Sequence, residues 1–326
     1  MKFLIAFITL FIFCACGTQR QYFSPENAPK LETKSNPNIK KLSKNTILNN
    51  NYIILDDNII TKDKIIPNFN IEKDYDLLAI IDEEYIIADK HGNLKILNNN
   101  KEEIFNHKFN KEVLNIAFRG DDMALILADN TIMLFNRSLG VKFSQTLSMA
   151  IANDSRIAAP IFTLDSVFYP SLDGRLIEVD RFSGEVLKDT IIGTEFYFNN
   201  IIYFNIIKDK KIIATSKSIK SIQNDDIKSL DYEIKDILNT DEYIFILTKD
   251  GNIIKTDLNL NILTQKKLNF AIFTKSIIHN NELYIYEKTG YAIKSDLNLK
   301  NIKVFEFKDI KNAKIFLSND KIFYKK

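Results

Sequence analysis

The chain contains few of the residues that build disulfides, metal sites and redox centres. Its 326 residues include no tryptophan, three histidines and two cysteines, and both cysteines, Cys14 and Cys16, lie near the N-terminus. The rest of the chain therefore has no thiol with which to form a disulfide, bind a soft metal or attack a substrate. Its folded part must be stabilised by a hydrophobic core, and a chain of this length can bury one.

Helical patterns and signature loops are also scarce. After about residue 45, no segment has ten or more residues with apolar side chains at helical spacing and with caps. Neither a glycine-rich phosphate loop nor a nucleophile elbow is present, which argues against nucleotide-binding and serine-hydrolase chemistry. The 44 basic and 42 acidic residues nearly cancel, so the charge gives no reason to expect nucleic acid as a partner.

Candidate metal ligands and acid–base residues are dispersed along the chain. The histidines are His91, His107 and His279, and the first and last of these fall in expected turns. Acidic pairs occur in polar loops, where solvated surface charge is the more common outcome: Asp56-Asp57, Glu83-Glu84, Asp121-Asp122 and Asp225-Asp226. None of the pairs has the spacing of a calcium loop. The sequence therefore predicts no catalytic residue and no metal site.

The N-terminus has the pattern of a bacterial lipoprotein signal. Lys2 precedes a mostly apolar stretch from Phe3 to Ala15, and the segment around Cys16 resembles the lipobox, in which the cysteine becomes the lipidated first residue. A transmembrane anchor is the alternative, but thirteen residues span only about 20 Å of a roughly 30 Å apolar layer. We expect residues 1–15 to be a signal peptide and Cys16 to be lipidated.

Residues 16–44 have the composition of a spacer. Pro25, Pro29 and Pro37 lie among polar residues, and the segment has no apolar period. We expect a lipid-anchored flexible tether, part of which could instead join the fold as a terminal strand.

From residue 45 onward, short β-branched and aromatic runs alternate with polar turns. Residues 84–96, 167–179 and 243–255 each read as a strand, a tight turn ending in glycine and a second strand, which is a strong hairpin pattern. Weaker copies of the turn are found elsewhere: Asp57-Asn58, Asp129-Asn130, Lys210-Lys211, Thr289-Gly290 and Asn319-Asp320. The turns recur with a period near 40 residues, roughly as in the blades of a β-propeller.

The repeats predict an all-β fold over residues 45–326: a β-propeller of about eight four-stranded blades. Seven blades result if the first and last hairpins share one blade, and an open β-solenoid is the rival architecture. The final unit is one strand short, so a strand from residues of about 30–44 could pair with it and close the ring.

One repeat also carries a family resemblance. Asp173-Gly174-Arg175-Leu176 is followed by Asp180 and then by Ser183-Gly184-Glu185-Val186. This pattern resembles the repeat of quinoprotein-like (PQQ-like) β-propellers. Together with the lipobox and the spacer, it resembles the BamB family of lipoproteins, which belong to the outer-membrane β-barrel assembly machine. Such repeats usually end in a tryptophan that packs between blades, and this chain has none.

The resemblance also raises the possibility of a quinone-dependent dehydrogenase. The family's redox sites pair a tryptophan platform with a disulfide between adjacent cysteines, and this chain can form neither after cleavage before Cys16. We therefore expect no enzyme activity and no cofactor.

An unusually aromatic run covers residues 196–204. The first interpretation is a pair of core strands around an Asn-Asn turn. The second is an exposed anchor for a partner, formed by Phe196, Tyr197 and Phe198, because aromatic side chains dominate interface hot spots. The sequence alone does not separate the two.

The resemblance implies a non-catalytic scaffold, lipid-anchored in the outer membrane and facing the periplasm, that binds envelope proteins such as the β-barrel assembly machine. Gly17 follows the lipidated cysteine, in place of the aspartate that retains lipoproteins in the inner membrane of enteric bacteria. The alternatives are a propeller that binds a small ligand at its channel mouth, and a surface-exposed lipoprotein that binds host or envelope molecules.

Overall fold

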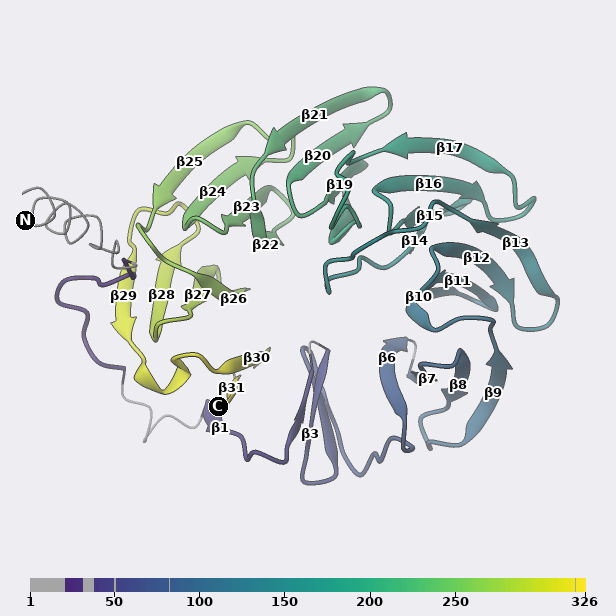
Figure 1. Cartoon of the computed structure of the whole chain (residues 1–326), viewed down its shortest axis with the longest axis horizontal. Helices are drawn as coiled ribbons and strands as arrows, with labels where there is room; N and C mark the ends of the chain where they lie inside the picture. The colour runs from purple at the N-terminus through teal and green to yellow at the C-terminus, as the bar shows by residue number, and fades with distance from the viewer. Residues whose placement is uncertain (1–20, 32–37, 50, 82, 320) are drawn as a thin grey trace, which may run out of the picture.

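The computed structural model describes residues 21–31, 38–49, 51–81, 83–319 and 321–326. These residues form a ring of eight small sheets around a central opening (Figure 1). Seven of the sheets have four strands, and the eighth has three among the described residues. The predicted β-propeller is confirmed, with eight blades rather than seven.

The first four blades follow one another along the chain. Blade 1 contains β2 (Ile47–Leu48), β3 (Tyr52–Leu55), β4 (Asn58–Thr61) and β5 (Ile65–Ile66). Blade 2 contains β6 (Tyr75–Ile81), β7 (Glu84–Asp89), β8 (Asn93–Leu97) and β9 (Glu103–Lys108). Blade 3 contains β10 (Val113–Arg119), β11 (Asp122–Leu127), β12 (Thr131–Asn136) and β13 (Gly140–Thr146). Blade 4 contains β14 (Ile161–Phe162), β15 (Ser166–Pro170), β16 (Arg175–Asp180) and β17 (Val186–Ile191).

The remaining blades complete the ring. Blade 5 contains β18 (Tyr203–Ile207), β19 (Lys210–Ala214), β20 (Ser218–Gln223) and β21 (Asp226–Asp231). Blade 6 contains β22 (Ile234–Asn239), β23 (Tyr243–Thr248), β24 (Asn252–Asp257) and β25 (Ile262–Lys267). Blade 7 contains β26 (Phe273–His279), β27 (Glu282–Glu287), β28 (Tyr291–Asp296) and β29 (Lys303–Glu306), and the 3-10 helix η1 (Lys308–Ile310) follows it. Blade 8 contains β30 (Lys314–Ser318), β31 (Lys321–Lys325) and β1 (Ile39–Lys41).

Blade 8 joins the two ends of the described chain. Strand β1 pairs in parallel with β31, with Ile39 opposite Ile322 and Lys41 opposite Tyr324. The backbone N–H of Leu42 also donates to the carbonyl oxygen of Tyr324 at 2.8 Å. A strand from within residues 30–44 therefore closes the ring, which covers an edge of β31 that would otherwise be open to pairing with another chain.

Other residues of the expected tether also contact the ring. Phe23 is buried and meets the ring of Tyr291 edge-on at 5.4 Å. The N–H of Leu31 donates to the carbonyl of Glu306, and the N–H of Glu306 donates to the carbonyl of Pro29, each at 2.8 Å. The described part of residues 16–44 is thus bound along blades 7 and 8. Cys16 and the expected signal peptide lie outside the described residues. Among the residues that the structure does describe, no helix is long and apolar enough to cross a membrane.

The glycine turns of the repeats occupy equivalent places in their blades. In each of these blades, the carbonyl oxygen of the turn glycine accepts a hydrogen bond from the N–H of the residue just after the fourth strand. In blade 2 the N–H of Phe109 donates to Gly92, and in blade 6 the N–H of Leu268 donates to Gly251, each at 2.9 Å. The same bond identifies Lys217 as the turn residue of blade 5, where it accepts from Tyr232. Two of the expected copies are not equivalent to these turns. Lys210-Lys211 begin β19, directly after the hairpin between the first two strands of blade 5, and Asn319 follows β30, the first strand of blade 8. Asp320 lies outside the described residues.

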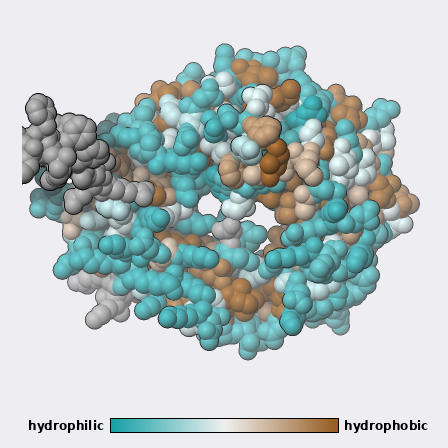
Figure 2. All heavy atoms as spheres, in the orientation of Figure 1, coloured by the Kyte–Doolittle hydropathy of each residue, from teal (hydrophilic) through white to brown (hydrophobic). Residues whose placement is uncertain are grey.

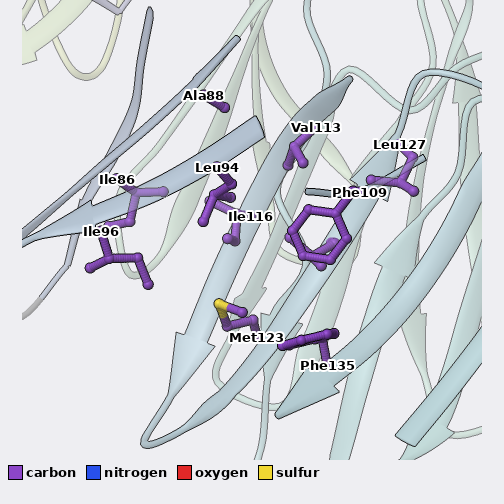
Figure 3. Packing of buried hydrophobic residues seen from close by; sticks show 11 residues of the cluster. Ile86, Ala88, Leu94, Ile96, Phe109, Val113, Ile116, Met123, Leu127 and Phe135 are labelled. Atoms are coloured by element: carbon purple, nitrogen blue, oxygen red, sulfur yellow. The ribbon is translucent and has the colours of Figure 1, made fainter. Parts of the chain in front are cut away.

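The core fills the spaces between neighbouring blades. Between blades 2 and 3, Ile86 and Leu94 face Met123 and Phe135, and all four side chains are fully or almost fully buried (Figure 3). The ring of Phe109 meets Phe135 edge-on at 5.4 Å. Phenylalanine here supplies the aromatic bulk between blades that tryptophan supplies in quinoprotein-like repeats.

Candidate protein-binding surface

One of the three histidines, His107, is packed among aromatic side chains. His107 packs against Phe109 and Phe135, both with ring centroids at 4.6 Å, and burial lowers the pKa of His107. Within the described ranges, no group of three or more His, Cys, Asp or Glu side chains is arranged to hold a metal ion. Asp56 and Asp57 form a turn with positive φ, and Asp225 is exposed.

Two of the acidic pairs contribute to the contacts between blades. Asp122 is buried and forms ion pairs with Lys142 and with Arg181 of the next blade, both at 3.3 Å. At the equivalent place one blade earlier, Glu84 pairs with Arg137. The interpretation of these pairs as solvated loop charges is therefore wrong for Glu84 and Asp122, because each accepts a basic side chain from the following blade.

The aromatic run contains both a strand and an exposed loop. Tyr203 and Phe204 belong to β18, but residues 192–202 form the loop that leads from blade 4 into blade 5. In this loop Phe196, Tyr197 and Phe198 are 70%, 53% and 50% exposed. The interpretation of the whole run as two core strands is wrong, and the three candidate binding residues are at the surface.

Two asparagines hold this loop in place. Asn200 is fully buried: its Oδ1 accepts the N–H of Asp154 at 2.7 Å, and its Nδ2 donates to the carbonyl of Arg156 at 2.8 Å. The Nδ2 of Asn199 donates to the carbonyls of Asp173 and Gly193 at 2.8 and 3.1 Å. A Cβ atom on Gly193 would overlap the Asn199 side chain, so the glycine allows this close approach.

A second loop, residues 147–160, lies beside the first and connects blades 3 and 4. The N–H of Phe198 donates to the carbonyl of Ala152 at 2.9 Å. Met149 and Ile151 of this loop are 86% and 57% exposed. Met149, Ile151, Phe196, Tyr197 and Phe198 are called the aromatic patch below. Met149, Ile151 and Phe196 also line a cavity of about 190 Å³. Figure 2 shows hydrophobic atoms beside the central opening on the face that it displays.

The loop with Met149 and Ile151 continues to the centre of the ring. Arg156 pairs with Asp154, with Nη2 at 2.6 Å from Oδ2, and its Nη1 donates to the carbonyl of Lys235 in β22 at 2.6 Å. Burial alone would raise the pKa of Asp154, but its hydrogen bonds from Arg156 outweigh burial and keep the pKa below its usual value. Arg156 could not be predicted from sequence, because no local pattern indicates which blade its side chain reaches.

Fold and surface define a class: an eight-bladed β-propeller that presents an apolar patch on the loops connecting blades 3, 4 and 5. No protein-family model matches the chain. The sequence is 35% identical over 220 residues to the plasminogen-binding protein PgbB of Helicobacter pylori strain J99, and 34% identical over 220 residues to PgbB of strain 26695. The similar region covers 65% of this chain and only 41% and 40% of those proteins. The chain thus spans less than half the length of the curated relatives it matches.

Solved structures share the fold at low sequence identity. BamB from Moraxella catarrhalis matches 82% of this chain and 93% of its own, with a TM-score of 0.65 and 13% identity. The computationally designed Ika8 protein matches 80% of this chain and 82% of its own, with a TM-score of 0.55 and 13% identity. The C-terminal WD40 domain of Sif2 matches 79% of this chain and 82% of its own, with a TM-score of 0.56 and 11% identity. The expected resemblance to BamB is confirmed at the level of the fold.

Proposed function

We propose that this chain is a non-catalytic propeller of the cell envelope that binds a protein partner through the aromatic patch. The observation that supports this most directly is the exposure of the patch: each of its five apolar side chains is at least 50% exposed. The loops that carry them are fixed by Asn199 and Asn200, so little ordering entropy is lost when a partner binds. Exposed aromatic residues on ordered loops are typical of interface hot spots.

The proposed partner is a component of the outer-membrane β-barrel assembly machinery. Two observations support this choice: the lipobox at Cys16 and the likeness of the fold to that of BamB. In this proposal, lipid on Cys16 anchors the protein in the outer membrane, and the propeller faces the periplasm.

Pull-down of tagged protein from native membranes tests the proposed partner. The double variant Phe196→Ser/Tyr197→Ser should lose the assembly-machine subunits that the wild-type protein recovers. Phe182→Ser is the matched control, since Phe182 is 66% exposed and lies in the hairpin at the opposite end of β17. Recovery of the same subunits by the double variant and the wild-type protein would refute the role of the patch.

The proposed anchor has a separate test. Cys16→Ser should abolish labelled-palmitate incorporation and leave the precursor unprocessed, as measured by mass spectrometry. Normal processing and labelling of this variant would show that the N-terminus is not a lipoprotein signal.

The sequence similarity to PgbB favours a second candidate, which is binding of plasminogen by a surface-exposed protein. Immobilised purified protein should then bind plasminogen in a surface plasmon resonance experiment, and protease treatment of intact cells should remove the propeller. A propeller that intact cells protect from protease, and that binds no plasminogen, leaves the assembly role as the remaining candidate.

A further inference from the structure

Two lysines whose ammonium groups form no ion pair within the described residues lie on the innermost strands of neighbouring blades. Lys235 is in β22 and Lys275 is in β26, and both side chains are half-buried. Within the part of the chain that the structure describes, no hydrogen bond, ion pair or cation–π contact involves either ammonium group. A half-buried charge without a partner is unfavourable, because burial removes part of its hydration and nothing replaces it.

Both lysines lie where the inner strand is irregular. The register between β22 and β23 shifts between Ile234 and Asp236, so Lys235 is the extra residue of a bulge. The register between β26 and β27 shifts between Phe273 and Lys275. The innermost strands of blades 2 and 3 have the same shift, so the irregularity belongs to the repeat. A bulge redirects side chains, and in blade 6 the extra residue is a lysine.

The nearby carboxylates are already engaged with other groups. Asp154 accepts from Arg156, and Asp236 accepts the hydroxyl of Ser276 at 2.5 Å and the N–H of Ile237 at 3.0 Å. The pKa values of Lys235 and Lys275 are lowered, mainly by burial and further by the charge of Arg156 and, for Lys275, by those of Lys62 and Lys235. Asp236 acts in the opposite direction on both lysines, and Asp154 does so on Lys235. The centre of the ring therefore has an excess of positive charge: Lys62, Arg156, Lys235 and Lys275 against Asp154 and Asp236.

This positive cluster is close to the aromatic patch. Arg156 contacts the backbone of Lys235, and four residues along the same loop lie between it and Ile151 of the patch. Five residue steps of extended chain span at most about 18 Å, so a peptide of about six residues reaches from Ile151 to the backbone of Arg156, whose side chain continues to Lys235. Figure 2 shows that the ring has an open centre on the face that it displays.

We propose that the mouth of the central opening binds an acidic peptide segment of the protein partner. Carboxylates of the segment pair with Lys235 and Lys275, and an apolar side chain about five residues away contacts the aromatic patch. This inference rests on the proposed protein-binding function and specifies that the bound segment of the partner is acidic. Charge-assisted hydrogen bonds replace the hydration that both ammonium groups have lost.

A binding titration with the purified full chain tests the inference. The probe is a dye-labelled peptide of about ten residues, with phenylalanine and tyrosine at one end and glutamates at the other, separated by a glycine-serine spacer. A second peptide has glutamine in place of every glutamate. The glutamate peptide should bind at least about tenfold more tightly, because charged hydrogen bonds are stronger than neutral ones.

The variant Lys235→Gln/Lys275→Gln should remove that preference. Its matched control is Lys266→Gln/Lys303→Gln, which removes the same charge from exposed positions on the outermost strands β25 and β29 of the same blades.

Salt gives a test that needs no variant, since sodium chloride should weaken the binding of the glutamate peptide alone. Equal affinities for the two peptides, an unchanged preference in the lysine variant, or a preference that does not respond to salt would overturn the inference. Inorganic phosphate that binds wild-type protein as tightly as the glutamate peptide would also overturn it, in favour of a simple anion site.

The pull-down separates this inference from the proposed function. Loss of the partner in Lys235→Gln/Lys275→Gln, as in the patch variant, supports the inference. If the patch variant loses the partner and Lys235→Gln/Lys275→Gln retains it, the proposed function stands and the binding of an acidic segment is refuted. A partner that neither variant loses refutes both.

Discussion

At the scale of the residue, single turn positions determine whether a blade closes. Gly251 has a φ of +86°, and its carbonyl accepts the N–H of Leu268 at 2.9 Å after the last strand of blade 6. A Cβ atom at this position would overlap the carbonyl oxygen of Leu268. The turn thus needs glycine both for its backbone conformation and for the approach of the outer strand.

Gly251→Ala should therefore destabilise the protein by more than the backbone conformation alone explains. Gly120 provides the comparison, because its φ is +61° and no heavy atom lies within 4 Å of an added Cβ. Gly120→Ala should lower the free energy of unfolding by about 1 kcal/mol, and Gly251→Ala by about 2–4 kcal/mol. Denaturant titration of both variants measures the difference, and equal losses would show that the overlap is relieved without cost.

Asp122 should make stability depend on pH on the acid side. Burial would raise the pKa of Asp122, but hydrogen bonds from Asn136, Lys142 and Arg181 hold it below the usual value. A carboxyl whose folded pKa is lowered stabilises the fold above its unfolded pKa of about 4, and this stabilisation is lost as the pH falls through the lower folded pKa.

The variant Asp122→Asn should lower the free energy of unfolding by about 2–4 kcal/mol at pH 7, since it leaves Lys142 and Arg181 without a counter-ion. The deficit relative to wild type should shrink as the pH falls below about 4, because the unfolded wild-type chain then binds a proton at Asp122 that the folded protein binds only at lower pH. Asp225→Asn is the control, because its side chain is 97% exposed. A deficit that stays constant from pH 7 to pH 3 would contradict the assignment.

At the scale of the element, the loop of residues 192–202 is shaped by partners distant in sequence. The side chain of Asn200 bonds to Asp154 and Arg156, which lie 46 and 44 residues earlier. No local pattern contains this information, so the aromatic run could be predicted neither as a strand nor as a loop. The Asp-Gly hairpins were predictable, in contrast, because their turn residues are adjacent in sequence.

Asn200→Ala should release both loops of the aromatic patch together. The N–H of Asp154 and the carbonyl of Arg156 lose their partners, so the free energy of unfolding should fall by about 2–3 kcal/mol. Hydrogen exchange of residues 152–158 and 196–200 should accelerate more than that of β15 and β16. The control is Asn106→Ala, at an exposed position of β9. Unchanged exchange in both loops would show that Asn200 does not hold them.

At the scale of the whole molecule, the ring is closed by a few buried side chains of blade 8. Phe316 and Phe323 pack against Ile53 and Ile60 of blade 1, and Tyr324 packs in the cluster shared with blade 7. The period of the turns could predict the number of blades. The sequence also suggested that a strand within residues 30–44 closes the ring, but it could not fix the parallel pairing or the register of Ile39 with Ile322, because these residues lie at opposite ends of the described chain.

Removal of residues 310–326 should therefore abolish cooperative folding of the ring. The deletion takes away five buried hydrophobic side chains of β30 and β31, whose burial contributes about 10 kcal/mol. That value is comparable to the whole free energy of unfolding of a typical protein. The milder variant Phe323→Ala should keep the fold and lose about 3–5 kcal/mol, whereas Phe182→Ala, at an exposed position, should lose less than about 0.5 kcal/mol. Calorimetry of the three proteins tests this order, and a truncated protein that melts at the wild-type temperature would show that the blades are stable without closure.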